Sequence, residues 1–438
     1  MQSVQSKNGP AMTVAACLWL GLFPLLQGGT YTRITLDKWL IFLALSAVTL
    51  LCFLVDLVIT KGLPRRPVLP LVLASALLLW TVLSCLFSQS GPGIWWLGES
   101  ARREGLSTQL GYFLVFFCFF FSRIRLKPIL YSSAAGVTAF FVIVMLQRAG
   151  GNPLGLYPAG RGYIYGHEFQ GTIGNIDMGV GYLLLISGLF LHSLADLILN
   201  RSADKEASPA PRPFLRRILF PAALLLGLVL SVFLIVTMEV QFGLLSLAVL
   251  LVFTFLRFLP KKARLAVLLF LVILALLVVW FWPGSQGGVW ELHEMLHGRT
   301  RLSFGSNRVA VWLFSLRLAR EDLFLGGGSG TFPARFNQYI LEHGLVIPKE
   351  QDGLPLPDYF DNPHNEYIQQ LTDHGLPALL LFTVLILAAF YRRREGWFPF
   401  LSPCSAAVLC YAVQAFFSFS VCIVAPMFWV VLGLSFRE

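Results

Sequence analysis

Apolar stretches of membrane-spanning length alternate with short polar segments along most of the 438-residue chain. A helix that crosses the hydrocarbon core of a bilayer needs about 20 apolar residues. By this criterion the pattern predicts spans near 11–28, 38–59, 68–88, 107–122, 128–147, 176–199, 218–236, 240–259, 265–282, 376–391, 397–416 and 418–435. It therefore indicates an all-α polytopic membrane protein with about 12 transmembrane helices.

The composition agrees, with 56% hydrophobic and 13% charged residues. The formal net charge of +10 alone would also fit a nucleic-acid-binding protein. However, the basic residues form clusters between apolar runs, at 61–66, 123–127, 201–217, 257–264 and 392–394. These clusters fall on alternate loops, as the positive-inside rule requires. We therefore expect both termini in the cytoplasm and no nucleic-acid partner.

The spans divide the chain into three parts. Residues 1–282 hold the first nine predicted spans, 283–375 form an extracytoplasmic loop, and 376–438 hold the last three. A loop of that length is usually functional rather than a connector. It contains its own helical pattern over 307–321, with Val309, Trp312, Leu313 and Leu316 on one face.

The outer segments are rich in arginine, which the orientation of the chain does not require. A guanidinium group binds pyrophosphate or carboxylate in a bidentate manner, whereas lysine serves membrane anchoring equally well. We therefore expect some of these arginines to bind an anionic substrate. The set is Arg102, Arg103, Arg148, Arg161, Arg299, Arg301, Arg308, Arg317, Arg320 and Arg335.

A polar strip, 361–376, leads directly into the tenth predicted span. Pro363 favours the start of a helix, so His364 is expected near a helix N-terminus, where free N–H groups attract anions. The ordinary pKa of histidine allows a neutral imidazole to accept a proton from a hydroxyl group. His364 is therefore the candidate general base, with a structural histidine as the alternative.

Other signals compete with this interpretation. His293-Glu294-Met295-Leu296-His297 matches the H-E-x-x-H pattern of zinc proteases, although no third ligand follows at a recognised spacing. Gly326 to Phe332 resembles a phosphate-binding loop but lacks the G-K-[ST] ending, so a flexible turn is the preferred interpretation. A transporter would show internal repeats or charges at mid-membrane, and neither is clear. The seven cysteines lie in apolar runs and predict no disulfide framework.

Several phrases together resemble the O-antigen ligase and polymerase superfamily of bacterial surface polysaccharide assembly. They are Gly171-Thr172-Ile173-Gly174-Asn175, preceded by Arg161; Asn307-Arg308 with Trp312; Leu325-Gly326 through Phe332; and Pro363-His364-Asn365-Glu366-Tyr367 with Gln369 and Asp373. One departure is the turn Met238 to Gly243, where the family commonly has Ser-Arg-Gly. Arg102, Arg103 or Arg148 are the candidates to replace that arginine.

The resemblance implies a GT-C-like fold and an inverting glycosyltransferase in the bacterial inner membrane. It would move a glycan from undecaprenyl pyrophosphate to a sugar hydroxyl on the periplasmic face. His364 would accept the proton, Arg161 and Arg308 would bind pyrophosphate, and Arg102, Arg103, Asn365 and Tyr367 would complete the substrate site. No metal or other cofactor is expected. A ligase that uses lipid A-core is favoured, with a polymerase as the alternative and a zinc protease as a further one.

Overall fold

The computed structural model describes residues 9–158, 168–204, 214–347, 350–351, 354–355, 359–392, 396–397 and 401–437. Helices dominate this part of the chain, and the strands form three two-residue antiparallel pairs. The longer helices are α1 (Pro10–Cys17), α2 (Ile34–Thr60), α3 (Val68–Leu86), α5 (Leu106–Phe120), α6 (Leu126–Arg148), α8 (Ile176–Asp204), α9 (Phe214–Thr237), α10 (Gln241–Arg257), α11 (Lys261–Trp280), α12 (Gly288–Leu296), α13 (Arg308–Leu318), α14 (Phe332–Glu342), α15 (Glu366–Ala388), α16 (Pro403–Ala415) and α17 (Ala425–Ser435). The all-α class is confirmed.

Seven helices of the described chain are long and apolar enough to cross a membrane: Tyr31–Thr60, Val68–Leu86, Leu126–Arg148, Ile176–Leu199, Ile218–Thr237, Lys261–Trp280 and Glu366–Ala388. Five shorter apolar segments are Pro10–Leu25, Leu106–Phe120, Gln241–Arg257, Pro403–Ala415 and Ala425–Ser435. The twelve-span count and the GT-C-like fold stay predictions. The last two predicted spans start too early, since α16 begins at Pro403 and α17 at Ala425.

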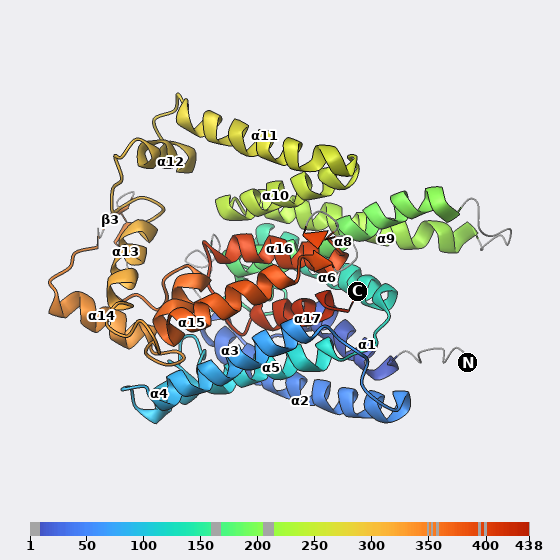
Figure 1. Ribbon diagram of the computed structural model, residues 1–438, viewed down its shortest axis with the longest axis horizontal. Coiled ribbons are helices and arrows are strands. Elements are labelled where there is room, and N and C mark those ends of the chain that lie inside the picture. Colours follow the sequence, from blue (N-terminus) through green and yellow to red (C-terminus); the bar gives the residue numbers. More distant parts are fainter. Residues whose placement is uncertain are drawn as a thin grey trace.

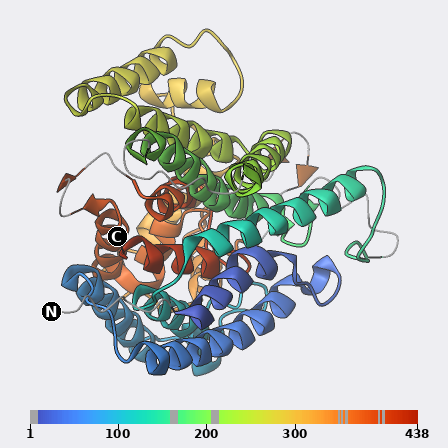
Figure 2. The same ribbon diagram turned by 90° about the vertical axis from the view of Figure 1, so that its right-hand side faces the viewer.

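The helices lie roughly parallel in a bundle (Figure 1), with α8 and α16 packed together near its centre. Seen from the end that carries the chain termini, α2 and α3 lie on one side and α10 and α11 on the opposite side (Figure 2). Burial differs sharply between helices. In its most apolar stretch, α8 has 67% of its residues buried, whereas α11 has 6%. A bilayer would therefore surround α11 on almost every side.

The described chain ends meet the basic loops at one end of the bundle. Arg66 donates hydrogen bonds to the carbonyl oxygens of Phe120 (2.6 Å) and Ser122. Arg437 donates to Ile124 O (2.9 Å). The labels in Figure 1 place α4 (Pro92–Leu97), α12, α13 and α14 at the opposite end. The bundle thus has a basic end and an end that carries the long loop.

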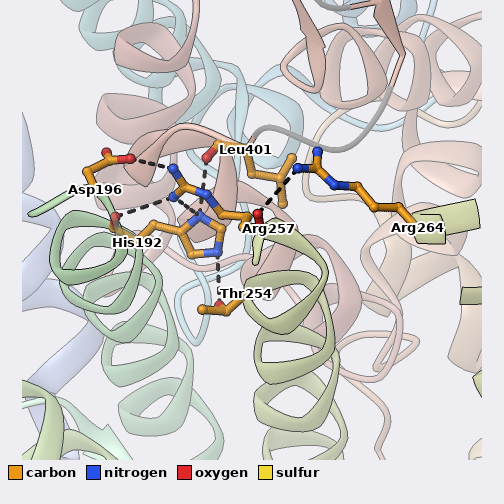
Figure 3. A network of polar contacts seen from close by, with 6 residues as sticks. All are labelled: His192, Asp196, Thr254, Arg257, Arg264 and Leu401. Carbon is orange, nitrogen blue, oxygen red and sulfur yellow. Dashed lines mark hydrogen bonds and ion pairs between the residues drawn. The ribbon is translucent and has the colours of Figure 1, made fainter. Parts of the chain in front are cut away.

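A polar network ties α8 to α10 near the basic end (Figure 3). Arg257 of α10 pairs with Asp196 of α8 and donates to Nδ1 of His192 (3.1 Å). The other ring nitrogen, Nε2, lies 3.1 Å from the Thr254 hydroxyl, and Nδ1 also lies 3.2 Å from Leu401 O. Each ring nitrogen of His192 therefore has a partner in either tautomer, as a buried polar group requires.

Helix α15 is broken at Gly375, beside the predicted start of the tenth span at 376. Gly375 has φ 78° and ψ 178°, and a Cβ there would lie 2.1 Å from Phe324 O. Only glycine fits such a position. The break frees carbonyl groups, which accept from the 326–332 loop and from α3: Gly328 N bonds Asp373 O (2.7 Å) and Ser84 Oγ bonds Asp373 O (2.8 Å).

Candidate active site around His364

Residues 359–365 run along the loop-bearing end of the bundle and are fixed by hydrogen bonds. Trp312 Nε1 of α13 donates to Pro363 O (2.9 Å), and His364 N donates to Asn362 Oδ1 (2.8 Å). Asn365 is the N-cap of α15 because its Oδ1 accepts from Tyr367 N (3.0 Å) and Ile368 N (3.1 Å). Those N–H groups are therefore not free to bind an anion, and the expectation that they would be was wrong.

His364 combines an unusual backbone with an unsatisfied ring nitrogen. Its φ of 49° lies in the left-handed region, which few residues with a Cβ adopt. The ring packs edge-on against Phe419, with centroids 5.3 Å apart. Nδ1 is buried and has no hydrogen-bond partner in the described chain. Such a nitrogen is ready to accept a proton or hydrogen bond from a substrate.

Burial, together with the positive charges of Arg308 and Arg102, lowers the pKa of His364 from its ordinary value to about 3. The imidazole is therefore neutral at neutral pH. A neutral ring between two cations has the charge state that a general base requires, and binding of an anion at the arginines would raise its pKa again.

Arg308 is the first residue of α13, and its charge acts on His364. Its guanidinium sits over the Phe242 ring, 5.1 Å from the centroid, and Nη1 donates to Gly305 O (3.1 Å). Nε is buried without a partner among the described residues. Burial lowers the pKa of Arg308, and the carboxylate of Asp177 opposes this effect. Arg308 thus retains unused capacity to bind an anion.

The polar side chain beside Arg308 is also unsatisfied. Asn307 is 2% exposed, and neither Nδ2 nor Oδ1 has a hydrogen-bond partner within the described ranges. Buried amides normally have partners, so this one has unused hydrogen-bonding capacity beside Arg308. The buried face of α13 consists of Ala310, Val311, Phe314 and Leu318, and the face predicted from Val309, Trp312, Leu313 and Leu316 was wrong.

Arg102 also acts on His364 through its charge, and it is already paired. It contacts Asp361 Oδ2 through Nε (2.7 Å) and Nη2 (2.6 Å), and its guanidinium lies 4.1 Å from the centroid of the Phe419 ring. The ion pair neutralises much of its charge. Of the two arginines whose charges act on His364, Arg308 can still bind an anion, whereas Arg102 is held by Asp361.

The other residues predicted for the substrate site occupy different positions. Arg103 lies over the Trp39 ring at 5.5 Å. The Tyr367 hydroxyl donates to Ala412 O (3.0 Å), which ties α15 to α16. Arg161 lies outside the described residues. Asn365 and Tyr367 thus use their polar groups within the protein.

Arg148 reaches the turn where the family motif departs. Its Nη1 donates to Thr237 Oγ1 (2.7 Å), and Nε donates to Gln170 Oε1 (3.1 Å). Among the three arginines considered as replacements, Arg102 and Arg103 have the contacts described above, and Arg148 is the one bonded at the turn after α9.

Several outer arginines support the loop instead of forming one common site. Arg299 pairs with Glu294 (2.7 Å), and Arg335 pairs with Asp322 (2.8 Å). Arg301 lies over the Trp290 ring and Arg317 over the Phe314 ring. The arginine-rich composition therefore has a structural component that composition alone does not separate from binding.

The zinc-protease motif is not arranged for metal binding. Nδ1 of His293 lies 3.1 Å from Val279 O, and Nδ1 of His297 lies 2.8 Å from His293 O. Both Glu294 oxygens accept from Arg299 (2.7 and 2.9 Å). Across the described ranges there is no group of three or more His, Cys, Asp or Glu residues that could hold a metal ion.

The glycine-rich segment 326–332 is not the flexible turn that was expected. Ser329, Thr331 and Phe332 are fully buried, and the segment packs against α3 and the break in α15. Ser329 Oγ lies 2.8 Å from Nε2 of His374. Its glycines allow close approach, since a Cβ at Gly326 would lie 2.5 Å from the backbone of α15.

Phe242, Asp177 and Phe419 belong to this site, but sequence reasoning missed them. Phe242 stacks on Phe417 with centroids 3.9 Å apart and supports Arg308. Apolar and aromatic residues in predicted spans carry no local signal for a site. Asp177 stands two positions after Asn175, the last residue of the Gly171–Asn175 motif, which was a usable clue.

Fold and site together define an all-α membrane protein that carries a neutral, unsatisfied histidine between two arginines at one end of its bundle. Residues 226–383 match the family model described as O-antigen ligase. This match includes Arg308, the 326–332 segment and His364, and it confirms the O-antigen ligase and polymerase superfamily indicated by the motifs. No curated protein matches the chain.

Proposed function

We propose that this protein is a glycosyltransferase that moves a glycan from undecaprenyl pyrophosphate to a sugar hydroxyl. In the preferred form it is an O-antigen ligase that acts on lipid A-core at the periplasmic face of the bacterial inner membrane. The observation that carries the proposal is His364, whose ring is neutral and whose buried Nδ1 is unpartnered, between Arg102 and Arg308 in the family-matched segment. A polymerase of the same superfamily is the alternative.

The proposed reaction is a direct displacement. The acceptor oxygen attacks the anomeric carbon of the donor, and its proton passes to Nδ1 of His364. The new carbon–oxygen bond forms as the bond between the anomeric carbon and the phosphate oxygen breaks. The electron pair of that bond leaves with undecaprenyl pyrophosphate. Such a displacement inverts the anomeric configuration.

The donor anion would itself prepare the base. In the free protein, the charges of Arg308 and Arg102 oppose protonation of His364. A pyrophosphate bound at Arg308 would offset this charge and raise the pKa of the ring toward its ordinary value. Proton transfer would therefore become favourable only with the donor in place, which would limit unproductive chemistry in the empty site.

The remaining residues divide into binding and positioning roles in this proposal. Arg308, with the unsatisfied amide of Asn307, binds the pyrophosphate, and Arg161 contributes a further cation. Asn365 and Tyr367 position the His364 strip by capping α15 and tying it to α16. Guanidinium groups supply the charge stabilisation of the leaving group, so no metal is required.

The test is a product assay with purified protein in lipid nanodiscs and a chelator in the buffer. The protein receives undecaprenyl-pyrophosphate glycan with or without lipid A-core, and products are separated by gel and mass spectrometry. Glycosylated lipid A-core supports the ligase. Longer lipid-linked glycan from donor alone identifies a polymerase. Absence of both products from folded protein contradicts the proposal, and loss of product on chelation contradicts its metal independence.

A further inference from the structure

A pocket lies beside the His364 strip, at the end of the bundle that carries the long loop. It has an empty volume of about 520 Å³, including space open to solvent. Four segments line it: the loop before α5, the glycine-rich segment, the strip with the start of α15, and the turn between α16 and α17. Asn362 and Phe419 belong both to its wall and to the surroundings of His364. The pocket is therefore next to the proposed base.

The pocket wall is acidic. It includes the carboxyl groups of Glu99, Glu104, Asp361, Glu366 and Asp373 and the single guanidinium of Arg102, which Asp361 already holds. The described wall of the pocket therefore offers no free cation to a pyrophosphate, and those of its carboxyl groups that are ionised would repel one. The phosphate-bearing part of the donor therefore belongs on the Arg308 side of His364, and this pocket suits a group that donates hydrogen bonds.

One carboxylate oxygen in this wall lacks a partner. Asp373 is 3% exposed, and its Oδ2 accepts from Gln369 Nε2 (2.7 Å) and Gly330 N (3.2 Å). Its Oδ1 is buried and has no hydrogen-bond partner in the described part of the chain. Leaving such an oxygen unsatisfied is costly, so the site is incomplete without a donor from a ligand. The unpartnered Oδ1 of Asp373 is thus a second observation that points to a ligand, separate from the acidic composition of the wall.

The lining chemistry favours a sugar over a metal ion. No group of His, Cys, Asp or Glu within the described chain is arranged to hold a metal. Glu366 already accepts from Gln370 (3.1 Å) and from Ser420 N (2.6 Å). The wall also offers amides such as Gln109 and Asn362 and the ring of Phe419. Planar amides and carboxylates that alternate with an aromatic ring suit the hydroxyl groups and the apolar face of a sugar.

Glu104 adds a further property to this wall. Burial raises the pKa of Glu104 to about 8, and the Tyr112 hydroxyl donates to its Oε1 (2.8 Å). The carboxyl group is therefore largely protonated at neutral pH. In that form it both donates and accepts hydrogen bonds, as a hydroxyl-bearing ligand requires.

We infer that this pocket binds the acceptor sugar, a hydroxyl-rich unit without phosphate or carboxylate, and that Oδ1 of Asp373 is its principal hydrogen-bond acceptor. The inference rests on the proposed function in its ligase form. Acceptor and donor then occupy different places near His364: the acceptor in the pocket beside Phe419, the donor pyrophosphate at Arg308, which does not line the pocket. The acidic wall excludes the donor from the acceptor position.

The test compares Michaelis constants of purified protein in nanodiscs, with lipid A-core varied at saturating donor and the donor varied at saturating lipid A-core. Asp373→Asn keeps the shape but replaces an acceptor oxygen with an amide. It is expected to raise the KM for lipid A-core by about tenfold and to leave the KM for the donor within about twofold. Glu342→Gln, an exposed carboxylate outside the pocket, is the matched control.

A second variant guards against a folding defect, because Asp373 also accepts a bond from Gly330. Gln109→Ala removes a pocket amide that, within the described chain, donates only a long hydrogen bond, to Glu104 Oε2 (3.4 Å). It should raise the same KM in the same direction, with an unchanged unfolding midpoint. An unchanged lipid A-core KM in both variants, or an equal rise in the donor KM, overturns the inference.

A binding measurement separates this inference from the proposed function. Fluorescent lipid A-core is titrated onto His364→Ala protein with and without Asp373→Asn. The inference predicts about tenfold weaker binding in the double variant. Equal binding overturns the pocket assignment while wild-type transfer to lipid A-core still supports the function. Absence of wild-type transfer to lipid A-core overturns the ligase function instead, and the acceptor assignment with it.

Discussion

The two ends of the bundle each contain a histidine, an arginine and an aspartate, but these side chains are paired differently at the two ends. Near the basic end, His192 has partners at both ring nitrogens and Arg257 pairs with Asp196 (Figure 3). At the opposite end, Nδ1 of His364 is buried without a partner among the described residues. Nε is buried without a partner there in both arginines, Arg257 and Arg308, so the difference between them is the ion pair of Arg257. The charge of Asp177 affects the pKa of Arg308, but the two side chains do not form an ion pair. The first set stabilises the helix packing, and the second has unused bonding capacity for a substrate.

Removing Arg308, the arginine near His364 that has no ion pair in the described chain, should have a large effect on glycan transfer. Arg308→Ala is expected to lower kcat/KM by about 100-fold, because charge on the leaving group loses its nearest free cation. The unfolding midpoint should change little. Arg317→Ala on the same helix, whose guanidinium lies over Phe314, is the control. If the Arg308→Ala protein transferred glycan at the wild-type rate, Arg308 would not bind the substrate, and the proposed difference between the two ends would be wrong.

Removing Arg257, which pairs with Asp196, should instead affect stability. Arg257→Ala leaves Asp196 unpaired and His192 without one partner, and we expect a loss of about 2–3 kcal/mol in unfolding free energy. Thermal unfolding in detergent, with Lys262→Ala as an exposed control, measures it. The folded fraction should transfer glycan at the wild-type rate. A loss of transfer at unchanged stability would mean that this network has a catalytic role.

Loss of the cap at Asn365 should have a smaller effect. Asn365→Ala removes the bonds to the N–H groups of Tyr367 and Ile368 and should cost about 1 kcal/mol of unfolding free energy. Asn365→Ser retains a capping oxygen and should restore most of it. If Asn365→Ala abolishes transfer while stability is unchanged, Asn365 contacts substrate directly and is not only a positioning residue.

The last expected effect is a change in acid sensitivity. The folded pKa of His364, about 3, lies below its ordinary value of 6.5. As the pH falls through this window, the unfolded chain binds a proton that the folded protein excludes, so stability falls. The contribution is fully present above pH 6.5. His364→Ala should therefore flatten the fall of the unfolding midpoint between about pH 7 and 5. An unchanged slope relative to wild type would contradict a buried neutral ring.

Local sequence was informative where one short segment determines the outcome. The apolar runs marked the helices because period and length are local properties. The Pro363–His364–Asn365 turn and Arg308 were recognised from the residues themselves. The pairing of Arg102 with Asp361 was not, because these residues are far apart in the chain and only the packing of the loop ends joins them.

The wrong face of α13 has a similar physical cause. Phe332 and Phe336 of α14 pack with Phe314 and Leu318, so the partner helix selects the buried side. Leu313 and Leu316 remain 39% and 43% exposed. In a chain this apolar, hydrophobic residues occur on every face, and their spacing alone does not identify the buried one. The acidic pocket is also invisible in the sequence, because four separate segments build it.

The most direct test of the account is the rate of glycan transfer to lipid A-core by His364→Ala, measured beside His192→Ala at equal amounts of folded protein. The account predicts that His364→Ala falls to about one-thousandth of the wild-type rate or less, whereas His192→Ala stays within about threefold of it. Wild-type transfer by folded His364→Ala protein would contradict the assignment of the base and, with it, the contrast between the two ends of the bundle.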